Sequence, residues 1–113
     1  MTEIKSNKRV TIITVTHNSM RVLPTMLASV PGGTRVIVVD NLSNDLKDLR
    51  DLCSELGVLL IENSFNEGFG AACNRGAELA TTEFLLFLNP DSILMSDTLD
   101  ELVAAAQRNP TAT

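Results

Sequence analysis

The sequence predicts an α/β domain built on a four-stranded parallel sheet with helices on both faces. Two observations lead to this fold class. Four short runs of aliphatic and β-branched residues alternate with helical patterns along the chain, which is the order of a parallel βαβ sheet. The runs are also nearly continuous in apolar residues, as in strands that are buried on both faces of such a sheet. A chain of 113 residues, 44% of them hydrophobic, is long enough for one domain with a core.

Each of the four expected strands ends in a polar residue or is followed directly by one. We predict right-handed crossovers and the strand order 3-2-1-4, because the β/α alternation is unbroken and the first and fourth strands are strongly apolar. The first strand is then central, and the strand order reverses between the first and the fourth. The expected strands cover Arg9–Thr16, Arg35–Asp40, Val58–Glu62 and Glu83–Leu88.

Four helices are expected between and after these strands. The first covers Pro24–Ala28, with its proline in the first turn, and the second runs from an N-cap at Ser43 to Gly57. The third covers Gly68–Ala80, and the fourth runs from Ser96 to just before Pro110. Spacing predicts that the second helix buries Leu46, Leu49, Leu52 and Leu56. By the same spacing the third helix is expected to bury Phe69, Cys73, Ala77 and Ala80. The fourth helix is expected to bury Leu99, Leu102, Val103 and Ala106.

Composition excludes several classes of protein. The net charge of -5 argues against a nucleic-acid-binding protein, which needs a basic surface. No apolar run approaches the roughly 20 residues of a membrane span, and the polar N-terminus does not resemble a signal peptide. We therefore expect a cytoplasmic protein whose residues 1–8 are flexible. Cys53 and Cys73 lack metal-ligand spacing and are expected to be small buried hydrophobes.

Polar residues collect where the expected strands end. Ligands of open parallel sheets bind outside the carboxyl ends of the strands, where strand order reverses. Any one polar loop could be ordinary surface, but these all lie at one end of one sheet. The clusters are Thr16-His17-Asn18, Asp40-Asn41, Asn63 through Gly70, and Asn89-Pro90-Asp91.

Two aspartates in these clusters suit particular ligands. Asp40 follows four apolar residues and could fix a turn, or accept a hydrogen bond from the ring N–H of a uracil or thymine. Asp91 is a hard oxygen ligand suited to Mg²⁺ or Mn²⁺, provided that phosphate oxygens and water complete the shell. Pro90 stiffens the turn between Asn89 and Asp91. His17, the only histidine, is expected to shape its loop rather than to act as a base.

The glycines do not form a known phosphate-binding fingerprint. Gly68 and Gly70 follow the third strand, whereas the dinucleotide-binding pattern follows the first strand and needs a further glycine where Cys73 stands. There is also no P-loop. We expect these glycines to let the backbone turn sharply or approach another segment.

Four segments together resemble family 2 glycosyltransferases with the Rossmann-like glycosyltransferase A fold, most closely their rhamnosyltransferase-like branch. The segments are VTIITVTHNS at 10–19, VIVVDNLSND at 36–45, NEGFGAACNRGAELA at 66–80 and FLLFLNPDSIL at 84–94. They occur in the family's order and spacing and span nearly the whole chain. One departure is Asn89 at the first position of the D-x-D-like motif.

The resemblance implies a site for a nucleotide-diphosphate sugar. Thr16, Asn18 and Asp40 would cradle the base and ribose, and Asn66, Gly68, Asn74 and Arg75 would line the donor pocket. Asn89 would touch ribose or phosphate. A divalent cation, Mg²⁺ or Mn²⁺, would rest mainly on Asp91.

The implied reaction is inverting transfer of a sugar from a UDP- or dTDP-linked donor to an acceptor hydroxyl, in cell-envelope polysaccharide synthesis. The family's domain is about twice this length, so we expect the chain to be its nucleotide-sugar-binding half. The acceptor half and the catalytic base would lie beyond residue 113, and the full-length enzyme could sit at the inner face of the membrane. The chain alone would bind donor but be inactive. Its exposed fourth strand would favour a homodimer, formed either by pairing two fourth strands or by packing helix against helix.

Two other functions stay open. A sugar-nucleotide-forming nucleotidyltransferase would share the sheet, but it wants a glycine-rich basic loop where this chain has THNSMR at 16–21. A non-catalytic nucleotide-binding or assembly module would bind donor without turnover.

Overall fold

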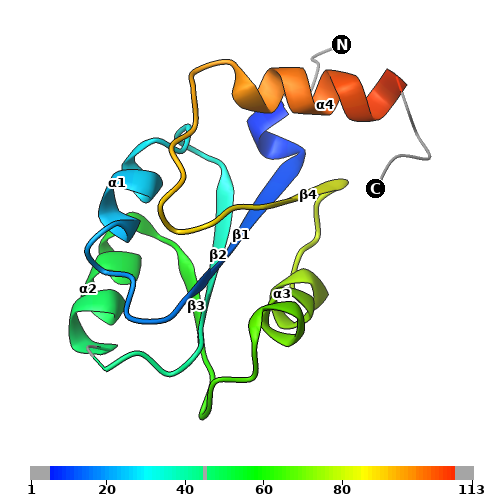
Figure 1. The fold of residues 1–113 in the computed structure, drawn as a ribbon. Helices are drawn as coiled ribbons and strands as arrows, with labels where there is room; N and C mark the ends of the chain where they lie inside the picture. The colour runs from blue at the N-terminus through cyan, green and yellow to red at the C-terminus, as the bar shows by residue number, and fades with distance from the viewer. Residues whose placement is uncertain (1–5, 45, 109–113) are drawn as a thin grey trace.

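A computed structural model describes residues 6–44 and 46–108 of the chain. It contains one four-stranded sheet in the order β3-β2-β1-β4, and every pair of neighbours is parallel (Figure 1). The predicted strand order and direction are therefore confirmed, with each strand within one or two residues of its expected ends. The strands are β1 Val10–Thr16, β2 Arg35–Asp40, β3 Leu59–Glu62 and β4 Phe84–Phe87.

Helices lie on both faces of this sheet, as expected. In Figure 1, α1 and α2 lie on one side of the strands and α3 on the other, while α4 lies beside the short 3-10 helix η1. None of the helices in the described ranges is long and apolar enough to cross a membrane. The helices are η1 Ser6–Lys8, α1 Leu23–Ala28, α2 Leu46–Leu56, α3 Phe69–Glu78 and α4 Thr98–Arg108.

The expected flexible segment 1–8 is described only in part. Residues 1–5 lie outside the described residues, while Ser6–Lys8 form η1. The Asn7 side chain donates a hydrogen bond of 2.8 Å to the carbonyl of Gly32, in the turn before β2.

The larger part of the core lies between the sheet and the helices α1, α2 and α4. Aliphatic side chains of β1 and β2 meet side chains from all three helices, because alternate residues of a strand point to the same face. The buried set comprises Val10, Ile12, Leu23, Met26, Leu27, Val36, Val38, Leu49, Cys53, Leu94, Leu99 and Val103.

The opposite face is covered by α3, which packs on β1 and β2. The fully buried residues of α3 are Ala72 and Gly76, while Ala77 of the predicted face is partly buried against the sheet, so the predicted buried face of this helix was right only in part. Phe69 is exposed rather than buried. A β-carbon at Gly76 would lie 2.7 Å from Cγ2 of Ile13. Only small residues fit at this contact, because the helix lies almost directly on the strands.

Two other expected helix details differ. Ser43 does not cap α2, because its backbone N–H and hydroxyl both bind Asp40, and α2 begins at Leu46. Leu56 and Leu102 are exposed, so the apolar stripes of α2 and α4 are narrower than their spacing suggested. Pro24 lies in the first turn of α1, as predicted.

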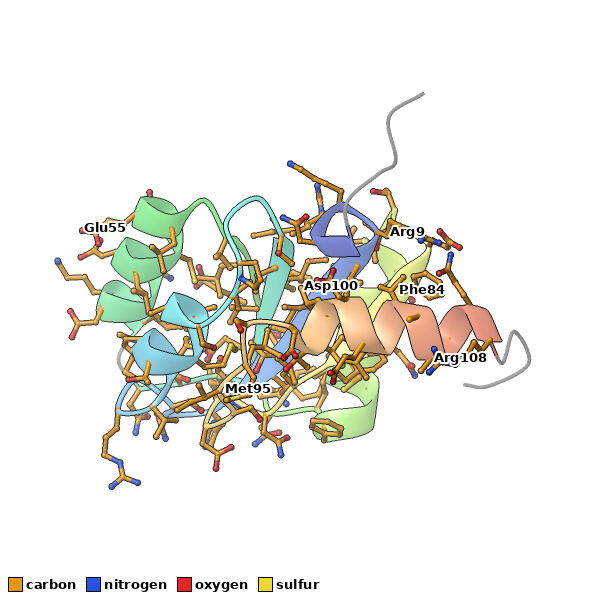
Figure 2. All side chains as sticks on the ribbon, turned by 90° about the horizontal axis from the view of Figure 1, so that it is seen from above. Arg9, Glu55, Phe84, Met95, Asp100 and Arg108 are labelled. Carbon is orange, nitrogen blue, oxygen red and sulfur yellow. The ribbon has the colours of Figure 1, made fainter. Side chains whose placement is uncertain are left out.

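An ion pair of Arg9 joins the amino end of β1 to the edge strand β4. The Arg9 guanidinium forms a bidentate ion pair with Glu83, with the shortest N···O distance at 2.8 Å. The same group lies 5.3 Å from the centre of the Phe84 ring (Figure 2). A partly buried bidentate pair of this kind restrains register more than an exposed pair would.

The outer side of β4 is open. Phe84 and Leu86 pack against the larger core cluster, so Leu85 and Phe87 point to the face that carries α3. No other strand of the described chain pairs with the outer edge of β4, and Leu85 and Phe87 are 41% and 45% exposed. The chain therefore presents an apolar edge strand, as the sequence predicted.

Replacing Gly76 with alanine should destabilise the fold, since the new β-carbon would lie 2.7 Å from Ile13 and 3.2 Å from Val39. We expect the free energy of unfolding to fall by about 1–3 kcal/mol, as for other overpacked cores. Gly70→Ala in the same helix is the control, because nothing lies within 4 Å of its β-carbon. Urea unfolding of both variants tests this, and equal stabilities would mean that α3 can move away from the sheet.

Candidate functional site

The carboxyl ends of β1 and β2 are joined by a buried hydrogen bond between side chains. Thr16, the last residue of β1, is the register partner of Asp40, the last residue of β2. Both side chains therefore project to the same face. The Thr16 hydroxyl donates to Oδ1 of Asp40 at 2.6 Å.

Asp40 is completely buried and accepts three hydrogen bonds from the chain. Besides Thr16, both the backbone N–H and the hydroxyl of Ser43 donate to its carboxylate. Hydrogen bonds to an ionised group of this kind offset the large cost of removing a charge from water. In this arrangement Asp40 holds the loop after β2 against β1, and its carboxylate is not open to a ligand.

Further hydrogen bonds join the loop after β1 to the loop after β2. Asn18 donates its backbone N–H to the Ser43 hydroxyl at 2.8 Å, and its side-chain oxygen accepts from the Asn44 N–H at 2.7 Å. The ring of His17 donates from Nδ1 to the carbonyl of Asn41, at 2.7 Å. His17 thus has the loop-shaping contact that the sequence led us to expect.

A second chain of hydrogen bonds runs from the end of β2 to the loop before α3. The Asn41 side chain donates to the carbonyl of Gly68 at 3.1 Å and accepts from the side chain of Asn63 at 2.8 Å. Asn63 also donates to Glu67 at 2.9 Å. Gly68 has φ 86° and ψ 169°, a conformation that is open almost only to glycine. These bonds fix the shape of the loop between β3 and α3.

Arg75, in the second turn of α3, completes this series of hydrogen bonds. Its guanidinium makes two hydrogen bonds of 2.8 Å to the carboxylate of Glu67, whose side chain is only 11% exposed. The hydrogen bond from Arg75 lowers the pKa of Glu67, and that from Glu67 raises the pKa of Arg75. Arg75 is therefore held by Glu67, whereas the exposed Asn74 beside it makes no side-chain hydrogen bond among the described residues.

The turn after β4 carries the remaining predicted site residues. Asn89 and Asp91 are exposed, and the turn is closed by a hydrogen bond from the Ser92 N–H to the Asn89 carbonyl at 3.0 Å. Asp91 makes no ion pair or side-chain hydrogen bond within residues 6–44 and 46–108. No hydrogen bond in those ranges joins this turn to the loops after β1 and β2. The structure thus links the predicted residues on β1, β2 and α3 but leaves the Asn89–Asp91 turn separate.

The thiols are poor candidates for chemistry. Cys53 is buried in α2, and its burial, followed by the charge of Asp40, raises its pKa to about 11. Partial burial also raises the pKa of Cys73. Thiolate is the reactive form of cysteine, so Cys53 reacts slowly near neutral pH, in line with its predicted role as a small buried hydrophobe, whereas Cys73 is only partly covered.

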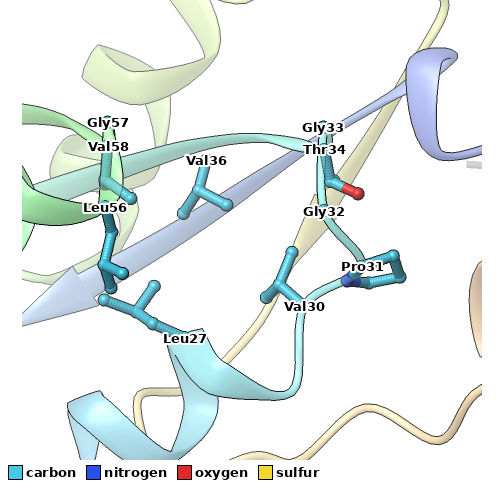
Figure 3. A pocket seen from close by; sticks show the side chains of 10 residues that line it. All are labelled: Leu27, Val30, Pro31, Gly32, Gly33, Thr34, Val36, Leu56, Gly57 and Val58. Atoms are coloured by element: carbon cyan, nitrogen blue, oxygen red, sulfur yellow. The ribbon is translucent and has the colours of Figure 1, made fainter.

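The cleft in Figure 3 lies at the other end of the sheet. It encloses about 190 Å³ beside the segments that precede β2 and β3, and no predicted site residue lines it. Its lining is mostly apolar, comprising Leu27, Val30, Pro31, Gly32, Gly33, Thr34, Val36, Leu56, Gly57 and Val58.

The sequence did not reveal which residues link the loops of the candidate site by hydrogen bonds. Asn41 and Asn63 were recognised only as members of polar clusters, and Ser43 only as a helix cap. The available signal was that amides follow two adjacent strands directly, where their side chains can reach each other. Glu67 gave no signal, because a single glutamate in a polar loop is ordinary surface.

Comparison with known proteins places this fold and site in a family. Residues 11–113 match the family described as "Glycosyl transferase family 2". The chain belongs to glycosyl transferase family 2. The match covers all four strands and the polar loops at their carboxyl ends.

Family 2 relatives are longer than this chain. An uncharacterized glycosyltransferase of Mycobacterium tuberculosis (strain H37Rv) is 32% identical over 95 residues, which are 84% of this chain and 42% of the relative. An uncharacterized glycosyltransferase of Haemophilus influenzae is 28% identical over 103 residues, which are 88% of this chain and 35% of the relative. The chain thus spans less than half the length of these glycosyltransferases.

Solved structures support the glycosyltransferase A fold. S. aureus TarS 1-349 superposes with a TM-score of 0.75 at 25% identity, covering 90% of this chain and 33% of TarS. The complex of the same protein with UDP gives a TM-score of 0.74 at 24% identity. GalNAc-T7, solved with UDP, GalNAc and Mn²⁺, gives 0.54 at 20% identity over 72% of this chain and 17% of its own. The glycosyltransferase fold is shared, while the rhamnosyltransferase-like branch stays a prediction.

Replacing Asp40 with asparagine should destabilise this family 2 domain. An amide would turn its NH₂ group towards donors that now bind a carboxylate, so we expect the free energy of unfolding to fall by roughly 1–3 kcal/mol. Asp51→Asn is the control, because Asp51 is exposed and its ion pair is with the likewise exposed Lys47; an exposed pair is worth little. If thermal or urea unfolding finds the two variants equally stable, Asp40 does not hold the two loops together.

Proposed function

We propose that this chain is the donor-binding part of a glycosyltransferase that moves a sugar from a UDP- or dTDP-linked donor to an acceptor hydroxyl. The observation that carries the proposal is the set of polar loops at the carboxyl ends of β1, β2 and β4 in a family 2 fold. Sheets of this kind bind nucleotides at that edge. The complex of TarS with UDP, a structure of the same fold, also supports a nucleotide donor.

The proposed residues divide into two groups by burial. Thr16 and Asp40 are buried and bonded to each other, so we assign them the role of holding the loops that meet the nucleotide. The exposed residues are the ones that can touch the donor directly. They are Asn18, Asn66, Gly68, Asn74, Asn89 and Asp91, with Arg75 exposed but paired to Glu67.

The Asn89–Asp91 turn fits a divalent cation that arrives with the donor. The described residues contain no cluster of three or more acidic, histidine or cysteine side chains that could hold a metal unaided. Mg²⁺ and Mn²⁺ sites of one or two carboxylates are nevertheless common where phosphates and water supply the other ligands. The exposed carboxylate of Asp91 and the side-chain oxygen of Asn89 are ligands of that type. When bound, such a cation would neutralise charge on the departing diphosphate.

The chain's own residues would bind and orient the donor rather than activate the acceptor. We assign no catalytic base within the 113 residues, and we propose that the chain alone binds donor without turnover. The relatives are about twice as long or longer, which leaves room in a full-length enzyme for an acceptor site and a base. A cytoplasmic location and a role in cell-envelope polysaccharide synthesis are part of the proposal for that enzyme.

Isothermal titration of the chain with a panel of nucleotide sugars, with and without Mn²⁺, tests this proposal. We expect UDP- or dTDP-sugars to bind only with the metal, and Asp91→Ala to reduce that affinity at least about tenfold, since a charge-assisted contact is lost. Asp48→Ala, on the exposed side of α2, is the control and should retain full affinity.

Three outcomes would contradict the proposal. Absence of binding to every nucleotide sugar would remove the donor-binding function. Equal affinities of Asp91→Ala and Asp48→Ala would show that Asp91 is only a turn residue. Turnover of donor by the chain alone would contradict the proposal that it binds without catalysis.

We also propose that the 113-residue chain forms a homodimer through β4. The outer edge of this strand carries backbone groups without a strand partner in the described chain, and no charged residue lies within Phe84–Phe87. Such an edge readily pairs with another strand. A two-fold axis perpendicular to the sheet would place Leu85 opposite Phe87 of the second copy, on the face that carries α3.

Phe87→Lys should weaken this association, because it places a charge in the proposed interface. Sedimentation velocity over a concentration series should show dimer for the unchanged chain and for the control Leu56→Lys, whose site on α2 is 52% exposed. The Phe87 variant should remain monomeric at the same concentrations. A strictly monomeric unchanged chain would refute the dimer.

A further inference from the structure

Leu42 has an unusual backbone conformation at the edge of the candidate site. Its φ is 59°, and the only other described residue besides glycine with a positive φ is Asn18, at 54°. In this left-handed region the β-carbon of a leucine crowds the following carbonyl oxygen, whereas asparagine is tolerated there. The two residues lie in the loops after β1 and β2, which are bonded to each other.

The two strained residues differ in what they do for the fold. The side chain of Asn18 accepts a hydrogen bond from the Asn44 N–H, so the conformation of Asn18 allows a bond that joins the two loops. Leu42 is 46% exposed and belongs to neither core cluster of the described residues. Glycine or asparagine would suit this backbone better, and folding gains little from a leucine at this position.

Hydrogen bonds anchor the residues on both sides of Leu42. The N–H of Asn41 donates to the carbonyl of Thr16 at 2.8 Å, and the N–H of Ser43 donates to Asp40. Both neighbours are buried, so Leu42 alone is exposed between two anchored residues. Strain that the surroundings enforce in this way is concentrated at ligand sites in proteins.

The strand order indicates which part of a nucleotide reaches Leu42. Asp91 follows β4 and Leu42 follows β2, with β1 between them. Neighbouring strands are about 4.8 Å apart, so these two loops are separated by roughly 10 Å across the sheet. That is about the distance from a diphosphate to the base of the same nucleotide. With the diphosphate at Asp91, the part of the donor that lies beside the loop after β2 is the base.

We infer that Leu42 is a donor-binding residue that packs against the face of the nucleobase. This inference rests on the proposed function. A base has flat apolar faces and polar edges, and an exposed leucine offers the face a matching apolar surface. The bonds around Asp40 hold the leucine in its strained position before the ligand arrives, which reduces the ordering cost of binding.

Replacing Leu42 separates this role from a structural one, because the two predict opposite results. Leu42→Asn and Leu42→Gly relieve the strained backbone, so the melting temperature should be equal to or higher than that of the unchanged chain. Affinity for UDP with Mn²⁺, measured by isothermal titration, should fall about fivefold or more in both variants, since apolar contact area is lost.

Leu79→Asn is the matched control. Leu79 is also 46% exposed, but it lies at the C-terminal end of α3 with a φ of -94°. Its replacement should leave UDP affinity unchanged.

The results distinguish the inference from the proposed function. Unchanged affinity in the Leu42 variants, with the unchanged chain binding UDP, would overturn the inference alone. Reduced affinity together with a lower melting temperature in both variants would also overturn it, because Leu42 would then be structural. No UDP binding by the unchanged chain would overturn both.

Discussion

The buried carboxylate of Asp40 is the constraint on which the candidate site depends. It is taken out of water at the end of the second strand and is stabilised by three donors, one from Thr16 of β1 and two from Ser43 in the loop after β2. Each donor is placed by something else: Thr16 by the register of β1 with β2, and Ser43 by the sharp turn through Leu42. A charge in this position tolerates little movement, because losing one donor exposes it to the full cost of desolvation. The loops proposed to contact the ligand are therefore held in place by their bonds to the rigid sheet.

The α3 side of the sheet contributes rigidity in a different way. Small residues bring α3 directly onto β1 and β2. Hydrogen bonds along Asn41, Asn63, Glu67 and Arg75 then connect the second turn of α3 to the ends of β2 and β3. Packing sets the position of the helix, and hydrogen bonds set the shape of the loop that leads into it. The Asn89–Asp91 turn has neither support among the described residues, so the stiffness of Pro90 and the closing bond to Ser92 are what define it.

The sequence predicted the sheet well because parallel strands have a strong signature. Continuous apolar runs, each followed by a polar residue, fixed both the elements and the edge where polar loops gather. Helix faces were less predictable: α3 buries Ala72 and Gly76 rather than Phe69, because packing distance to the sheet, not hydrophobicity, selects the face. Site roles were harder still. Asp40 was placed at the correct edge of the sheet, but only the register with Thr16 and the bonds to Ser43 reveal that its carboxylate is internal.

Reaction of the two cysteines with a thiol reagent would report local opening of the folded chain. Cys53 lies beneath the site in α2, with its pKa raised by burial and by the charge of Asp40, whereas Cys73 in α3 is only partly covered. A thiol reagent added to the folded protein would reach Cys73 by small local excursions. Modification of Cys53 requires α2 to move away from the strands. The labelling rate of this one sulfur therefore records how often α2 opens from the sheet.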